Sequence, residues 1–350
     1  MRAFHWNNAT RREDLAKAIR YELDAALKCR NKDSHEFICL DDIEKIWTLQ
    51  RIQSLSKGLP WDKPALHERA LADYRLVLSV LVWIHWDGWS DFGKVFLEHV
   101  DRRRIFDRED RYLPFDATTE LLTQQNHNNE FLKRQYIFIP IELAEEGSNQ
   151  HATNKDDYEA LYRMPFLDTK VIGTGATGDV FKALIAPKYF LYEQGHQNLK
   201  PMWVAIKRIQ RSDEVKVKNF TAEQKALRVF KQCLQKHENI MHSFLSFTHG
   251  AHFVIISPLA DLDLAAFFSG VYDGFEARQR SFTPFDLFQE AACLAGALHF
   301  LHNGLELRGS KIACAHLDFK PDNREASRTR IYCKRKLLRQ LPAPGSQLPF

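Results

Sequence analysis

Residues 173–180 read Gly-Thr-Gly-Ala-Thr-Gly-Asp-Val, and Phe-Lys-Ala follows them. Glycines at 173, 175 and 178 leave room for backbone N–H groups to approach phosphate oxygens closely. A glycine pattern of this kind also opens the helix of dinucleotide-binding folds, and it occurs in plain turns. Here the residues after Gly178 are typical of a strand, which disfavours the dinucleotide interpretation. We therefore expect a strand–turn–strand hairpin over residues 171–184, with the apolar side chain of Val180 covering one side of a flat nucleobase.

Downstream of this hairpin, residues 202–209 contain the strand-like run Val-Ala-Ile-Lys at 204–207. In isolation Lys207 would be an ordinary surface lysine at a strand end. Behind a glycine hairpin, its compact ammonium can hold the α- and β-phosphates of a nucleotide. Glu223 follows in the helical pattern FTAEQKALRVF. It is either a solvated glutamate or the ion-pair partner that aims Lys207 at the phosphates.

The most specific stretch is His-Leu-Asp-Phe-Lys-Pro-Asp-Asn at 316–323. Asp318 has an apolar residue on each side, and Lys320 and Asn323 follow at fixed offsets. This spacing supplies a carboxylate for a substrate hydroxyl, a cation for a transferring phosphoryl group and an amide ligand for Mg²⁺.

Together these motifs resemble the eukaryotic protein kinase family, with a catalytic loop of the Ser/Thr type, over roughly residues 166–323. The resemblance implies an α+β, bilobal fold with a complete strand-rich small lobe and a partial helical large lobe. It implies ATP and Mg²⁺ as ligands, with Asp318 as the base, Lys320 on the phosphoryl group and Asn323 on the metal. The residues that it places at ATP are Gly173, Gly175, Gly178, Val180, Ala205, Lys207, Glu223, Ser257 as gatekeeper, and Pro258 and Ala260 of the hinge.

The chain departs from the family pattern at two places. Leu317 stands where many kinases carry an arginine that gathers a phosphorylated activation loop. No Asp-Phe-Gly triplet with a metal-binding aspartate follows Asn323, and the Asp-Phe-Gly at 91–93 precedes the glycine hairpin, so we interpret it as coincidence. We expect the 350-residue chain to be a truncated kinase with feeble or no activity. The alternative is a catalytically dead module, a truncated form or pseudokinase, that binds nucleotide or a partner. Lys320-Pro321 disfavours a third class, small-molecule phosphotransferases.

Four segments follow from the pattern along the chain. Residues 1–144 form a mainly helical extension, 145–158 a polar linker, 159–323 the partial kinase domain and 324–350 a basic tail. Expected helices start at Thr10 and Asp42 and cover 65–86 and 284–302; a further strand covers 252–256. The extension is similar to those that precede kinase domains in some filamentous-fungal proteins. The tail has seven basic side chains against one acidic side chain, and we expect it to be disordered or a gene-model artefact.

Composition excludes several classes of function. The net charge of +4 is concentrated in the tail, so the body of the protein gives no support for DNA or RNA binding. Six cysteines without a C-x-x-C pair disfavour zinc sites and disulfides. The longest apolar run, at 76–86, is too short to span a membrane. We expect a cytoplasmic protein whose helical extension binds a protein partner; the Lys-Arg-Lys at 334–336 is a weak indication of a nuclear location.

Overall fold

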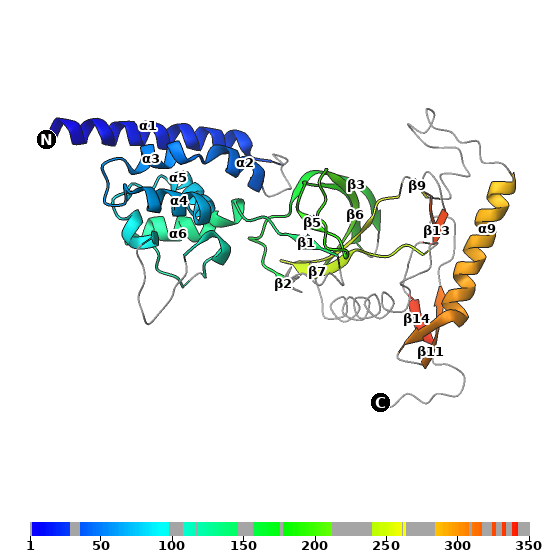
Figure 1. Ribbon diagram of the computed structural model, residues 1–350. Coiled ribbons are helices and arrows are strands. Elements are labelled where there is room, and N and C mark those ends of the chain that lie inside the picture. Colours follow the sequence, from blue (N-terminus) through cyan, green and yellow to red (C-terminus); the bar gives the residue numbers. More distant parts are fainter. Residues whose placement is uncertain are drawn as a thin grey trace.

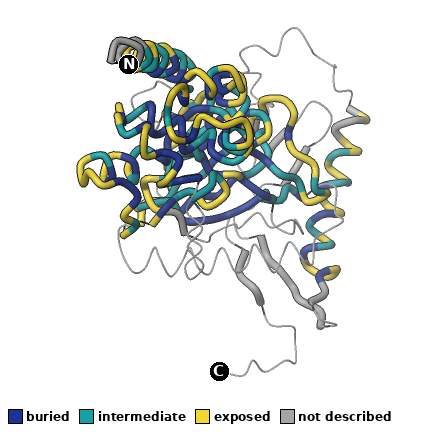
Figure 2. The backbone as a smooth tube through the Cα atoms, turned by 60° about the vertical axis from the view of Figure 1, so that its left-hand side comes forward, coloured by how far each residue is buried: buried dark blue, intermediate teal, exposed yellow. Residues whose placement is uncertain are grey.

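The computed structural model describes residues 2–28, 36–97, 108–116, 118–145, 157–175, 178–211, 240–260, 262–263, 284–307, 310–316, 324–326, 331–333 and 338–341. Helices α1 to α6 gather at one end of the molecule, a β-sheet lies in the middle and helix α9 stands at the other end (Figure 1). The predicted α+β class is confirmed. Buried backbone runs through the interior of the molecule, with exposed segments around it (Figure 2).

The helical region begins with one long helix. Its helices are α1 (Arg2–Ala26), α2 (Leu40–Ile46), α3 (Leu49–Ser56), α4 (Pro64–Asp73), α5 (Arg75–Trp83) and α6 (Gln125–Arg134), with short turns η1 (Gly93–Leu97), η2 (Asp110–Tyr112) and η3 (Gln135–Ile137). The start expected at Thr10 is wrong, because residues 2–9 contain no Gly or Pro and the helix extends back through them. The second start is also wrong: α2 begins two residues before Asp42.

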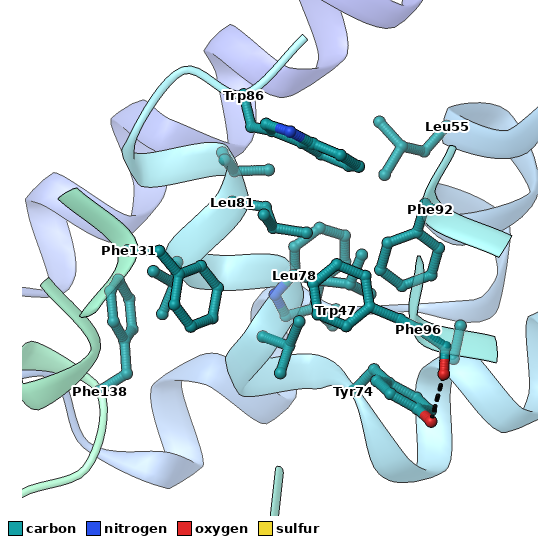
Figure 3. Close-up of a cluster of buried hydrophobic side chains, with 14 of the residues drawn as sticks. Trp47, Leu55, Tyr74, Leu78, Leu81, Trp86, Phe92, Phe96, Phe131 and Phe138 are labelled. Atoms are coloured by element: carbon teal, nitrogen blue, oxygen red, sulfur yellow. Dashed lines mark hydrogen bonds between the residues drawn. The ribbon is translucent and has the colours of Figure 1, made fainter. Parts of the chain in front are cut away.

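The helix expected over 65–86 is two helices, because Tyr74 leaves the helical conformation between them, at φ −136° and ψ 19°. The buried hydroxyl of Tyr74 donates to the carbonyl oxygen of Phe96, 2.8 Å away, so the residue at the break is held by a distant partner (Figure 3).

Aromatic and aliphatic side chains fill the centre of the helical region (Figure 3). This helical core includes Trp47, Leu78, Leu81, Phe92 and Phe131, each at most 2% exposed. The indole N–H of Trp47 donates to the hydroxyl of Ser79 at 2.8 Å, so its polar atom is satisfied. Phe92, the centre of the Asp-Phe-Gly triplet at 91–93, packs against Trp61 with ring centroids 4.8 Å apart. The triplet therefore has a packing role in this core.

Arginine side chains satisfy carbonyl groups at or near the ends of three helices. Arg12 donates to Leu55 at the end of α3, at 2.7 Å. Arg20 donates to Val82 near the end of α5 at 2.9 Å, and Arg51 donates to Ile46, the last residue of α2, at 2.8 Å. The last carbonyls of a helix have no partner within it, so these contacts stabilise the packing of α1 and α3 on their neighbours.

At the start of α5, the acidic side chain of Asp110 satisfies backbone N–H groups, as the arginines satisfy carbonyl groups at helix ends. Its carboxylate accepts the backbone N–H groups of Leu76 and Val77, both at 2.9 Å. Burial raises the pKa of Asp110 from its ordinary 3.8 to about 7. A carboxyl group whose folded-state pKa is raised adds most to stability at low pH, and that contribution is lost as the pH rises through the folded-state pKa.

Wild type is therefore expected to lose stability relative to Asp110→Asn between pH 5 and pH 7, by up to about 1.4 kcal/mol per pH unit. Urea denaturation of both proteins at several pH values measures the difference. Asp14→Asn, at an exposed position of α1, is the matched control and should follow the wild-type curve. Parallel pH profiles for wild type and Asp110→Asn would contradict the prediction.

Five antiparallel strands form the central sheet, in the order β7-β8-β6-β4-β3. They are β3 (Phe166–Gly175), β4 (Gly178–Ile185), β6 (Met202–Gln210), β7 (Leu245–His249) and β8 (His252–Pro258); short β2 (Asp157–Tyr158) joins β7 in parallel. The strands expected over 171–184, 202–209 and 252–256 are confirmed. Alternate residues on one face are buried and form the sheet core, which includes Ala183, Val204, Ile206, Val254 and Ile256.

Segments from outside the sheet cover this buried face. Phe37, Ile141 and Leu143 from the N-terminal half of the chain belong to the sheet core, as do Tyr189 and Phe190. Two short strands, β1 (Leu143–Ala144) and β5 (Phe190–Leu191), pair in parallel within this cover. The opposite face of the sheet is partly exposed at Val180, Ala205, Lys207 and Ser257.

The C-terminal part begins with α9 (Pro284–His299) and η5 (Phe300–Gly304), over the residues where a helix was expected. Strands β10 (Leu305–Leu307), β11 (Ser310–His316) and β14 (Leu338–Leu341) form one small sheet, and β9 (Leu262–Asp263), β12 (Arg324–Ala326) and β13 (Ile331–Cys333) form another. The tail, for which we expected disorder or an artefact, thus contributes three short strands to these sheets. Within the described residues no helix is both long and apolar enough to cross a bilayer.

Candidate functional site

The glycine stretch forms the hairpin between β3 and β4, as predicted. Gly173 lies opposite Val180, and Gly175 lies opposite Gly178. The register shifts between Val171 and Gly173, so a bulge precedes the first glycine. Bulges bend a strand and re-aim its residues, and they are frequent next to functional sites.

Two glycines of the hairpin differ in what the fold demands of them. Gly178 has φ +122°, and a Cβ atom there would lie 2.1 Å from the carbonyl oxygen of Arg208 on β6. Only glycine fits this close approach of two strands. Among the residues that the structure describes, a Cβ atom at Gly173 would meet nothing nearer than the Cβ of Val180 at 4.0 Å. None of these residues therefore requires glycine at 173.

The strand register brings Val180 next to Lys207. Val180 on β4 lies directly opposite Lys207 on β6, which lies opposite Ile255 on β8. Two residues along, Ala205 lies opposite Ser257. Directly opposed residues of an antiparallel sheet point to the same side, and their strand neighbours point to the other. Because those neighbours fill the sheet core, the predicted residues Val180, Ala205, Lys207 and Ser257 share the opposite face of the sheet, here called the lysine face, with Lys182.

Exposure of the lysine face suits a binding surface. Val180, Ala205, Lys207 and Ser257 are all partly exposed, whereas the residues of the sheet core on the same strands are buried. Further along this face, Ile255 and Phe253 of β8 are buried and pack with Ile209. Pro258 ends β8 opposite Val204, and Pro258 and Ala260 are partly exposed too. Small side chains at Ala205 and Ser257 leave this part of the face flat.

Lys182 lies on the lysine face although it belongs to none of the sequence motifs. It lies opposite Ala205, and its Nζ atom lies 4.9 Å above the ring centre of Trp203. The two-residue period of β4 places Lys182 on the same side as Val180. Lys170 of β3 lies opposite Lys182, so the described part of this face carries three lysines.

The remaining predicted residues are not brought into this site by any described contact. Glu223, Asp318, Lys320 and Asn323 lie outside the described residues, and of Gly175 only the backbone is described. Among the residues that the structure describes, no group of three His, Cys, Asp or Glu side chains could hold a metal ion. The assignment of Mg²⁺ to Asn323 stays a prediction.

Comparison of the sequence with protein-family models and with curated proteins yielded no match. The functional argument therefore rests on the geometry of the lysine face and on the motifs.

Proposed function

We propose that the chain binds Mg-ATP on the lysine face and is a protein kinase domain protein that transfers the γ-phosphoryl group to Ser or Thr hydroxyls of proteins. The observation that carries this proposal is the register that sets Lys207 beside Val180, next to the glycine hairpin. Two sequence motifs that are separate along the chain, the glycine hairpin and the Val-Ala-Ile-Lys strand, meet there.

The order of the strands supports a kinase-like small lobe. In protein kinases a glycine-rich loop covers the phosphates, and the phosphate-binding lysine lies on the third strand. Here β3 and β4 form the glycine hairpin and Lys207 lies on β6, the third long strand of the sheet. The space that the described residues leave at Gly173 fits close approach of phosphate oxygens to the backbone.

The end of the lysine face away from the glycine hairpin suits the adenine ring of ATP. Ala205 and Ser257 provide a surface of small side chains, and the residues after β8 provide backbone groups at its edge. The carbonyl of Pro258 can accept from the adenine amino group, and the N–H of Ala260 can donate to the ring. Ser257 occupies the gatekeeper position, where a small side chain leaves room behind the base.

The transfer step is assigned to residues 316–323. Asp318 would accept the proton of the substrate hydroxyl, Lys320 would neutralise charge on the transferring group, and Asn323 would hold Mg²⁺. Bound Mg²⁺ would supply charge neutralisation for the phosphates.

A second candidate is a nucleotide- or partner-binding module without turnover. The observation that favours it is the sequence after Asn323, where Arg-Glu-Ala forms β12 and no Asp-Phe-Gly triplet follows. Such a module would bind nucleotide on the lysine face in the same way but would not transfer the phosphoryl group.

Calorimetric titration with a non-hydrolysable ATP analogue, with and without Mg²⁺, tests the shared part of both candidates. Saturable, Mg²⁺-dependent binding is expected, and its absence would exclude both candidates.

Transfer of radiolabelled phosphate to a mixture of Ser/Thr peptides separates the two candidates. If the chain is a kinase, Asp318→Asn should lower the rate of phosphoryl transfer by about 10²- to 10⁴-fold. Binding without any transfer in the wild type identifies the second candidate.

A further inference from the structure

Two adjacent residues between α1 and α2 enter different cores. Phe37 is fully buried in the sheet core, whereas Ile38 is fully buried in the helical core. The backbone here is held on both sides: Lys28 N–H donates to Phe37 O at 2.8 Å, and Ile38 N–H donates to Ile137 O at 2.9 Å. Successive residues of an extended segment point in opposite directions, so this segment fastens one core to the other.

The chain crosses between the cores a second time after α6. Phe138 lies in the helical core, and Ile141 and Leu143 lie in the sheet core. Leu143 N–H donates to the carbonyl of Tyr189 at 3.0 Å, which starts the pairing of β1 with β5. The two crossings, at 37–38 and 138–143, join the helical region to the sheet through packed side chains as well as through the chain.

Both crossings contact the same receiving element, the β4–β6 connection (residues 186–201). Its Tyr189 meets Phe37 edge to face, with ring centroids 6.3 Å apart, and the Tyr189 hydroxyl accepts the N–H of Leu40 at 3.1 Å. Next to it, Lys188 forms an ion pair with Asp41 of α2 at 2.7 Å. The helical region therefore contacts the sheet at a polar rim around an aromatic centre.

The β4–β6 connection is itself rigidly organised. Asn198 is 5% exposed, and its side chain donates to Ala186 O at 2.9 Å and accepts from Phe190 N–H at 2.8 Å. The connection joins the end of β4 directly to the start of β6. These are the two strands that carry Val180 and Lys207. A force on the connection therefore acts on both strands of the lysine face.

We propose that residues 36–41 and 141–144 form an intramolecular docking joint through which the helical region controls the lysine face. Docked, the joint holds β4 and β6 in register. A protein that binds the helical region and opens the joint loosens both strands, and a ligand on the lysine face favours the docked state by the same factor, because such coupling is reciprocal. The coupling to nucleotide rests on the proposed function; the joint itself does not.

Hydrogen exchange of the full chain, read by mass spectrometry, tests the joint without nucleotide. In Phe37→Ala we expect the amides of β4 and β6 to exchange at least tenfold faster. The matched control is Phe131→Ala, which removes an equally buried phenyl ring from the helical core and should leave β4 and β6 exchange unchanged. Unchanged exchange in Phe37→Ala, or an equal increase in both variants, would overturn the proposal.

Tyr189→Phe keeps the ring and removes only the acceptor for Leu40 N–H, so it serves if Phe37→Ala does not fold. We expect the β4 and β6 amides of Tyr189→Phe to exchange roughly threefold faster, because one neutral hydrogen bond is lost. Exchange at the wild-type rate in this variant would overturn the proposal. Affinity for Mg-ATP, measured in the same proteins, should fall in the same order. If wild type binds no nucleotide but exchange responds as expected, the proposed function fails and the joint stands.

Discussion

Gly178→Ala should lower the free energy of unfolding by about 3–5 kcal/mol, which is exceptional for the addition of one methyl group. The new Cβ would lie 2.1 Å from the carbonyl oxygen of Arg208, and neither atom belongs to a flexible side chain that could rotate away. The positive φ of +122° adds strain for any L side chain. Relief requires β4 and β6 to separate, and these strands hold Val180 beside Lys207. Urea denaturation measures the loss, and nucleotide affinity should fall with it.

Gly173→Ala separates the structural from the ligand-binding use of glycine. Its new Cβ has ordinary contact only, so wild-type stability is expected, while Mg-ATP affinity should fall about tenfold if phosphates approach this backbone. Gly296→Ala is the control in open space: a Cβ there meets nothing within 4 Å, and alanine should stabilise α9 by up to about 1 kcal/mol. Equal stability losses at 173 and 178 would contradict this interpretation of the hairpin.

Lys207→Met should weaken Mg-ATP binding by about ten- to a hundredfold, because each hydrogen bond from a charged donor contributes about 1.5–3 kcal/mol. Methionine keeps most of the aliphatic stem, so the register with Val180 and Ile255 should persist. Calorimetric titration measures the affinity, and circular dichroism confirms that the fold is retained.

Lys17→Met is the matched control for Lys207→Met. It removes the same charge from an exposed position of α1, outside the sheet. We expect a change in affinity of less than threefold. Similar losses in the two variants would mean that binding depends on net charge rather than on the lysine face.

Local pattern was enough to predict much of the sheet. The period of two in Val180-Phe181-Lys182 and in Val204-Ala205-Ile206-Lys207 identifies which side chains share a face, because strand geometry fixes that alternation. The glycine spacing likewise predicts the hairpin between β3 and β4. What it does not reveal is that Gly178 serves the packing of β4 on β6 and Gly173 does not.

Helix ends in the N-terminal region were predicted less well. The Thr10 start was wrong because a favourable cap residue contributes only about 1 kcal/mol and an uninterrupted helix outweighs it. The break at Tyr74 was missed because its partners are over twenty residues away: Tyr74 bonds Phe96, and Asp110 accepts N–H groups in the first turn of α5. The arginine contacts at the ends of α3 and α5 are distant in the same sense.

By itself, then, the sequence determined the local elements of the candidate site: a glycine hairpin, a strand in which Lys207 ends an apolar run, and the alternation of side chains along each strand. The tertiary structure decided which face is covered by the helical half of the chain. Phe37, Ile141 and Leu143 come from that half and fill the core on one side of the sheet, so Lys207 and Val180 lie on the other side. No local pattern specifies this, because the partner of a buried side chain is set by packing between segments that are far apart in sequence.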